Sequence, residues 1–117
     1  MSVARFTFKD DTLIWAGVGN VEGRVVRPNL AHRVSEPLIA ARGAVGVRLL
    51  PGLRTVSLDL ERDAILVFAT DGIDPAFADS VPLLGDVDEI ANGILREHAR
   101  ATDDALVVVA RYRGRPA

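Results

Sequence analysis

Two apolar runs in this chain each border aspartates, the residues most able to do chemistry here. Residues 64–69, Ala-Ile-Leu-Val-Phe-Ala, lead directly into Thr70-Asp71-Gly72, and residues 105–110, Ala-Leu-Val-Val-Val-Ala, follow Thr102-Asp103-Asp104. Each run has the length and composition of a buried strand. If the two strands are antiparallel neighbours, Asp71, Asp103 and Asp104 converge at one edge of a sheet.

Converging carboxylates repel one another, and a hard cation with oxygen ligands relieves that repulsion. The same residues also have a structural explanation, because Asp-Gly closes many turns and Asp side chains often accept backbone hydrogen bonds where an element begins. The local sequence leaves both interpretations open.

The elements that must position these carboxylates are mostly strands. Alternating apolar residues and turn signals predict them at 3–8, 12–18, 21–26, 43–50 and 53–58. Lys9-Asp10-Asp11 and Pro51-Gly52 are expected to close hairpins, and the glycines at 17–23 to mark a strand turn. These glycines do not favour a phosphate-binding loop, because no helix-forming segment follows. Residues 28–42 are expected to form an exposed loop or a short extended segment, with His32 on the surface.

Two helices are predicted between the apolar runs. A short one begins at Pro75, with Asp74 as its cap and Phe77 as its anchor. A longer one begins after Asp86, because six residues then fall on one face at helical spacing: Val87, Ile90, Ala91, Ile94, Leu95 and His98. Glu97 and Arg100 are expected to form a solvated ion pair on the opposite face.

Composition narrows the functional class. The chain has 117 residues, which fits one domain spanning 1–117, and its net charge of −2 gives no support for nucleic-acid binding. It contains no cysteine, which excludes disulfides and thiolate chemistry. Because no apolar run has the length of a membrane helix and no signal peptide is recognisable, we expect no membrane association and a cytoplasmic location.

Several motifs, in this order, resemble a known family. They are Gly17-Val18-Gly19-Asn20-Val21-Glu22-Gly23, Arg42-Gly43-Ala44-Val45-Gly46, Leu58-Asp59-Leu60-Glu61-Arg62-Asp63 with Thr70-Asp71-Gly72-Ile73, and the closing Asp103-Asp104 before three valines. Together they resemble the C-terminal half of the metal-dependent protein phosphatases, the protein phosphatase 2C superfamily, and within it the bacterial SpoIIE and RsbX-like branch.

This resemblance implies an α+β fold: a mostly antiparallel β-sheet with one long and one short helix packed on one face, like half of the family's α-β-β-α sandwich. It also implies an Mn²⁺- or Mg²⁺-dependent serine/threonine phosphatase that acts on a phosphoserine or phosphothreonine regulatory protein in bacterial partner-switching signalling. Asp71 and Asp103 correspond to metal ligands. Asp104 and Gly72 correspond to neighbours that support the ligands.

The chain departs from the family pattern upstream of Gly17. The N-terminal half of the family's domain, with the aspartate that bridges two metals, has no counterpart here, since Asp10 and Asp11 fall in a predicted hairpin turn. We therefore expect weak or no turnover by this chain alone. Half of the two-sheet sandwich is expected to be missing, which would leave an apolar sheet face uncovered.

An uncovered face favours a partner, either a second copy in a homo-oligomer or a complementing N-terminal half. The alternative to the phosphatase is a non-catalytic phosphatase-like interaction module that dimerises or binds a regulatory protein. A third and weaker hypothesis is a small-molecule binding domain with a closed apolar pocket.

Overall fold

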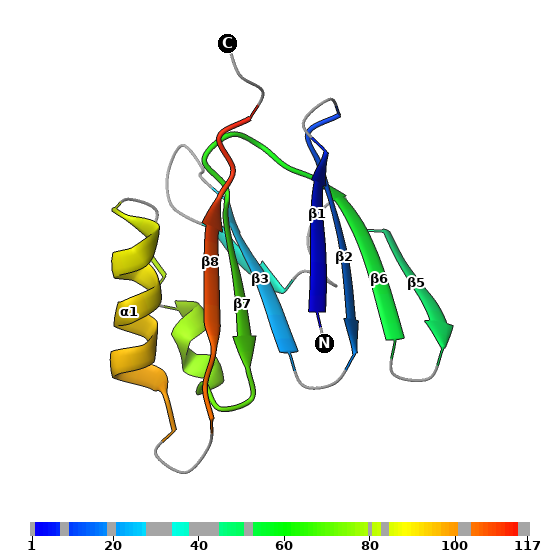
Figure 1. Cartoon of the computed structure of the whole chain (residues 1–117). Coiled ribbons are helices and arrows are strands. Elements are labelled where there is room, and N and C mark those ends of the chain that lie inside the picture. Colours follow the sequence, from blue (N-terminus) through cyan, green and yellow to red (C-terminus); the bar gives the residue numbers. More distant parts are fainter. Residues whose placement is uncertain are drawn as a thin grey trace.

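In the part of the chain that the structure describes, eight strands form two four-stranded antiparallel sheets (Figure 1). The computed structural model describes residues 2–7, 10–18, 21–27, 34–37, 45–50, 53–79, 81–82, 85–100 and 104–114. The first sheet has the order β1 (Ser2–Thr7), β2 (Thr12–Val18), β6 (Leu53–Asp59) and β5 (Val45–Leu50). The second has the order β4 (Val34–Pro37), β3 (Val21–Arg27), β7 (Ile65–Thr70) and β8 (Val107–Arg111).

The two sheets pack face to face around one apolar core. Leu13 and Trp15 on β2, and Val56 and Leu58 on β6, point inward because alternate residues of a strand share one face. They meet side chains of the second sheet, and the rings of Trp15 and Phe68 stack with their centroids 6.3 Å apart. This core ties the two layers together.

Tyr112, just beyond β8, closes the same core at one edge. The residue is 3% exposed, and its ring stacks on that of Phe6 of β1 at a centroid separation of 6.3 Å. Its hydroxyl donates a hydrogen bond to a carboxylate oxygen of Asp11, in the turn between β1 and β2, over 2.5 Å. Asp11 therefore has a structural role in the hairpin turn where the sequence places it.

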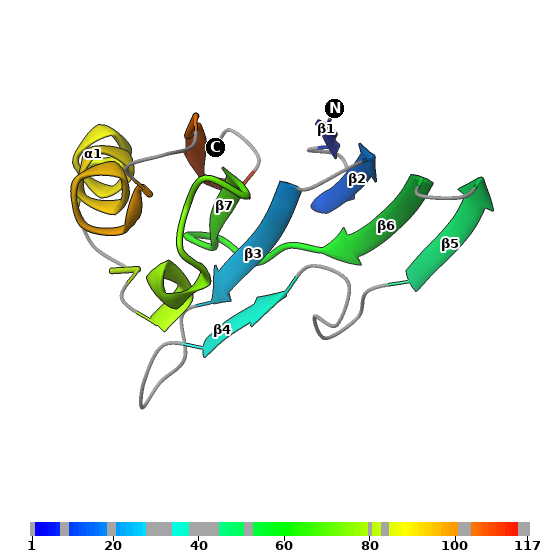
Figure 2. The same ribbon diagram turned by 90° about the horizontal axis from the view of Figure 1, so that it is seen from below.

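A layer of helices covers the other face of the second sheet. The α-helix α1 (Val87–His98) and the 3₁₀ helix η2 (Pro75–Asp79) lie on this side (Figure 2). Asp86 caps α1, because its side chain accepts a hydrogen bond from the backbone N–H of Asp88 over 3.0 Å. Asp74 accepts one from Ala76 over 2.9 Å at the start of η2, and Phe77 is fully buried below it.

The predicted fold class is confirmed: the chain is α+β, with antiparallel sheets, one long helix and one short helix on one face. The two predicted hairpins are present as β1–β2 and β5–β6. Within the predicted 28–42 loop, residues 34–37 form the short edge strand β4, which pairs with β3. His32 lies outside the described residues.

The strands on either side of the glycines at 17–23 do not pair with each other, because β2 and β3 belong to different sheets. The expectation of an uncovered apolar sheet face needs correction. The described residues build two sheets that cover each other's inner faces, with helices on the outer face of the second sheet. The outward positions of the first sheet are mixed, with Ile14 38% exposed beside the exposed Ser57, so the described part of this face is not an apolar surface.

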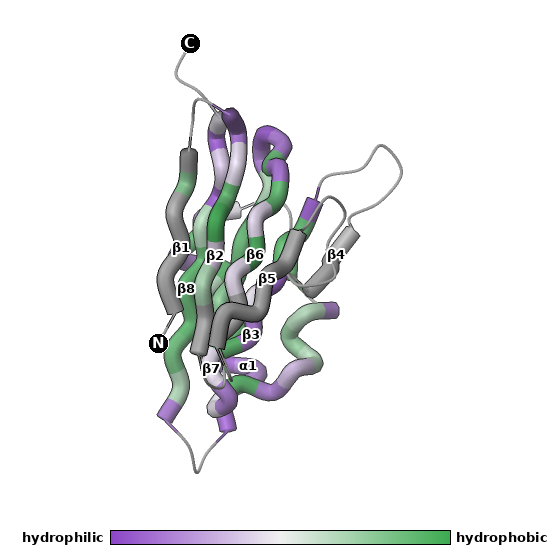
Figure 3. Tube along the Cα trace, turned by 90° about the vertical axis from the view of Figure 1, so that its right-hand side faces the viewer, coloured by the Kyte–Doolittle hydropathy of each residue, from purple (hydrophilic) through white to green (hydrophobic). Residues whose placement is uncertain are grey.

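Figure 3 shows that the most hydrophobic stretches of the chain lie largely in the strands, whose side chains form the two core clusters. No helix within the described ranges is both long and apolar enough to cross a membrane.

We predict that Phe77→Ala destabilises the protein by about 3–5 kcal/mol, because the ring fills the space between η2 and the second sheet and its removal leaves a cavity. Urea denaturation followed by circular dichroism measures this. Ile14→Ala, at a position 38% exposed, is the control and should change stability far less. Equal losses in the two variants would contradict the assignment of Phe77 to the core.

Candidate functional site

The turn that follows β7 carries Asp71. The backbone N–H of Ile73 donates to the carbonyl of Thr70 over 3.0 Å, which closes the turn. Asp71 is exposed at its tip, whereas Gly72 and Ile73 are buried. The turn thus exposes the Asp71 carboxylate to solvent, while the two residues that follow it are buried.

The segment after α1 clamps this turn from one side. The N–H of Asp74 donates to the carbonyl of His98, and the N–H of Arg100 donates to the carbonyl of Gly72, both over 2.8 Å. Between these two bonds, Ile73 and Ala99 form an isolated antiparallel bridge. Because these are backbone bonds, they fix the path of the turn independently of the side chain at position 71.

The residues that directly precede β8 hold the turn from a second side. β7 and β8 are antiparallel neighbours, as expected, and the N–H of Thr70 donates to the carbonyl of Leu106 over 3.1 Å. A Cβ atom placed on Gly72 would overlap the carbonyl oxygen of Asp104. Only glycine lets these two backbones approach so closely. The Asp71 turn and the acidic segment that includes Asp104 are therefore adjacent.

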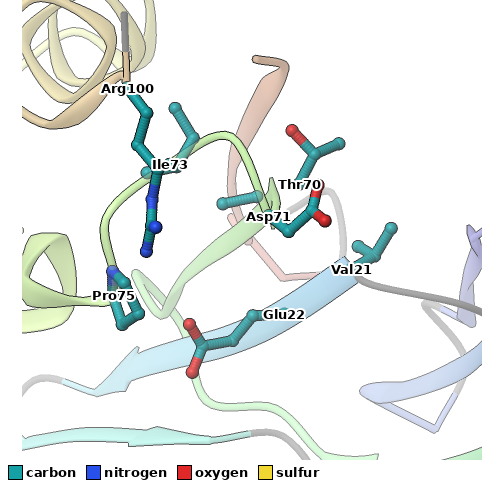
Figure 4. Close-up of a pocket in the computed structure, with 8 residues that line it drawn as sticks. Val21, Glu22, Thr70, Asp71, Ile73, Pro75 and Arg100 are labelled. Atoms are coloured by element: carbon teal, nitrogen blue, oxygen red, sulfur yellow. The ribbon is translucent and has the colours of Figure 1, made fainter. Parts of the chain in front are cut away.

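A pocket of about 280 Å³ opens beside the turn. Figure 4 shows Arg100 and Glu22 reaching into it from different elements, with Asp71 on the turn after β7. The lining residues come from β3, β7, the turn and the segment after α1: Val21, Glu22, Ala69, Thr70, Asp71, Ile73, Pro75 and Arg100.

The pocket combines two carboxylates with one guanidinium. Glu22 lies on β3 opposite Ala69, and its carboxylate forms an ion pair with Arg24 at 3.3 Å, with 37% of the Glu22 side chain exposed. Arg100 brings a positive charge to the same pocket as Asp71. This arrangement can bind a group that presents both positive and negative charge, such as a metal-bound anion.

The predicted site residues are only partly placed. Asp71 lines the pocket, Gly72 supports the turn from below, and Asp104 is exposed beside it. Asp103 lies outside the described residues. The assignment of Asp71 and Asp103 as metal ligands therefore stays a prediction.

Two lining residues have no role in the sequence-based hypothesis. Glu22 stands inside one of the family-like motifs, but only the β3–β7 pairing brings it to the end of β7. Arg100 was expected on a helical face with Glu97. Since α1 ends at His98, Arg100 lies beyond the helix and lines the pocket instead. The available signal was in the sequence: Arg100 stands shortly before Asp103 and Asp104, which were themselves expected at the site.

The described residues do not complete the metal site that the resemblance implies. Among them, no group of three or more His, Cys, Asp or Glu side chains is placed to hold a metal ion. Asp71 and Glu22 provide two carboxylates at the pocket, whereas Mn²⁺ and Mg²⁺ take six oxygen ligands, several of them water. A metal ion at this pocket would need further ligands from outside the described residues.

Comparison with known proteins identifies the architecture. No family model matches the sequence, and no curated protein matches it. Among solved structures, the phosphatase domain of the cell fate determinant SpoIIE from Bacillus subtilis, presoaked with Mn, superposes with a TM-score of 0.70 at 17% sequence identity. The match covers 100% of this chain and 57% of that domain, so this chain spans little more than half its length. The resemblance inferred from the motifs is confirmed at the level of the fold.

We predict that Gly72→Ala destabilises the protein by about 1–3 kcal/mol, because the added methyl group forces the turn away from the Asp104 carbonyl. Thermal unfolding measures the change. Gly93→Ala is the matched control: its Cβ would meet nothing closer than 3.8 Å within α1, and we expect it to stabilise the protein by about 0.5–1 kcal/mol. A Gly72→Ala protein as stable as the unsubstituted one would show that the two backbones need not be in contact.

Proposed function

We propose that this chain provides part of the active site of a SpoIIE-like, Mn²⁺- or Mg²⁺-dependent protein phosphatase, with Asp71 as one metal ligand. The observation that supports this most is the clamped turn, which holds an exposed carboxylate at the end of a buried strand and beside the acidic segment before β8. The substrate class we propose is a phosphoserine or phosphothreonine regulatory protein.

The metal in such a site supplies an activated water and stabilises charge on the phosphoryl group. The residues of this chain would orient that chemistry. Asp71 offers a carboxylate oxygen, and Arg100 offers a guanidinium that can bind a phosphoryl oxygen at the same pocket. We propose that the remaining ligands come from Asp103 and from another polypeptide or a second copy of this chain.

A non-catalytic role is the second candidate. The observation that favours it is that the described residues bring only two carboxylates to the pocket, fewer than a two-metal centre uses. In that case the fold serves as an interaction module, and metal has no effect on its assembly. The cytoplasmic location expected from the sequence also stays a prediction.

We predict that Asp71→Asn weakens Mn²⁺ binding by at least about tenfold, because an amide oxygen is a poorer ligand for a hard cation than a carboxylate. Titration of Mn²⁺ followed by electron paramagnetic resonance measures binding directly. Asp59→Asn is the control, since Asp59 is exposed and pairs with Thr12 in the first sheet, whereas the Asp71 turn follows a strand of the second sheet. Equal affinity in the Asp71→Asn and unsubstituted proteins would remove Asp71 from the site.

The same samples separate the two candidate functions. Hydrolysis of p-nitrophenyl phosphate that needs Mn²⁺ and is lost in Asp71→Asn, but kept in Asp59→Asn, supports the phosphatase. Hydrolysis confined to an oligomer would locate the missing ligands in another copy. Absence of hydrolysis, together with an assembly that is unaffected by metal, favours the interaction module.

A further inference from the structure

β8 lies at one end of the second sheet. Figure 2 shows the row β4, β3, β7 and β8, with α1 along one side of that row. Among the described residues, no strand pairs with the outer side of β8. This edge can therefore accept another strand.

The backbone of β8 presents alternate groups to that outer edge. The carbonyl of Leu106 accepts from Thr70 over 3.1 Å, and the N–H of Tyr112 donates to the carbonyl of Ala64 over 2.9 Å. Because hydrogen-bonded pairs recur at every second residue of an antiparallel ladder, the even-numbered residues of β8 bond to β7. The N–H and C=O groups of Val107 and Val109 consequently point away from the sheet.

The same edge is apolar and unguarded. Val108 on β8 is 50% exposed, and Leu106, directly before β8, is 62% exposed; both are on the same side of the chain as Ala110, which packs against the core between the two sheets. Edge strands usually avoid pairing with other chains because they are short, or because they carry a proline, a charged residue or a β-bulge. β4 is four residues long and contains Pro37, and β5 has a register shift between Arg48 and Leu50. Residues 105–110 contain neither proline nor charge.

The charges at the two ends of this edge indicate what pairs with it. Asp104 is exposed before β8 begins, and Arg113 follows its end, with 73% of its side chain exposed and an ion pair to Asp63 at 3.2 Å. A second β8 running antiparallel brings the acidic end of each strand beside the arginine end of the other. The charges at the ends of one β8 are therefore complementary to those of a second, antiparallel β8.

We propose that two copies of this chain dimerise by antiparallel pairing of β8 with β8 across a two-fold axis. Pairing joins two four-stranded sheets into one. The favoured register places Val108 opposite the Val108 of the second copy, Val107 opposite Val109, and Leu106 opposite Ala110. It satisfies the outward backbone groups and covers the exposed apolar side chains together.

This dimer does not depend on the proposed phosphatase activity, because it uses the outer edge of β8 and not the pocket. It would place two Asp71 turns on one continuous sheet, since each turn lies beside the start of its own β8.

Sedimentation equilibrium of the 117-residue chain tests the assembly. We expect a dimer whose dissociation constant rises at least about tenfold in Val108→Lys, because two ammonium groups then meet at the two-fold axis. Ile14→Lys is the matched control: Ile14 is also exposed, at 38%, but lies on β2 inside the first sheet, and its substitution should leave the dimer intact. A protein that stays monomeric at millimolar concentration would overturn the proposal.

Amide hydrogen exchange tests the interface residue by residue. The amides of Val107 and Val109 should become protected as protein concentration rises, whereas those of Val108 and Ala110 should be protected throughout. In Val108→Lys, the first pair should lose protection and the second pair keep it, which shows that β8 itself remains folded. A dimer in which Val107 and Val109 stay unprotected would place the interface elsewhere and refute the proposal.

A single cysteine tests the register, because the natural chain contains none. Val108→Cys should form an intermolecular disulfide on mild oxidation, since directly opposed residues at a non-hydrogen-bonded position have Cβ atoms about 4.5–5.5 Å apart. Ile14→Cys should not. Equal crosslinking of the two variants would contradict the β8 pairing.

Discussion

Burial of both faces of β7 is the constraint on which the rest of the structure depends. Ile65, Leu66 and Val67 are each fully buried, although successive side chains of a strand point to opposite sides. The first sheet covers one face, while α1 and η2 cover the other. Burying each such side chain contributes roughly 1.5–3 kcal/mol, so a strand of this composition requires both layers. The result is a rigid platform at the end of which Asp71 stands.

Backbone contacts hold the turn that carries Asp71. Hydrogen bonds from the segment after α1 hold one flank of the turn, and the contact of Gly72 with the Asp104 carbonyl holds the other. Asp71 can therefore remain exposed without losing its position. This division suits a ligand-binding carboxylate, whose oxygens have to stay accessible while its main chain stays fixed. It also explains why a glycine directly follows the aspartate.

The sequence predicts the elements well where an apolar run or a helical stripe has a single interpretation. β7, β8 and α1 are of this kind, whereas the antiparallel pairing of the first two was a supposition in the sequence analysis that the structure bears out. The connection from β2 to β3 could not be predicted in the same way, because its glycines are compatible both with a hairpin and with a crossing from one sheet to the other. Glu22 and Arg100 join the pocket only through strand order and the end of α1 at His98, which are tertiary facts with no local signature.

The crossing between sheets also bears on how quickly the protein folds. β2 pairs with β6, and β3 with β7, so the central strands of both sheets meet partners that are distant along the chain. Closing such long loops costs chain entropy before any core forms, and folds dominated by non-local strand pairs reach the native state in about milliseconds to seconds. α1 gains its buried surface only once the second sheet exists. The Asp71 turn is bonded to the segment after α1 and touches the segment before β8, so its native form requires both to be in place.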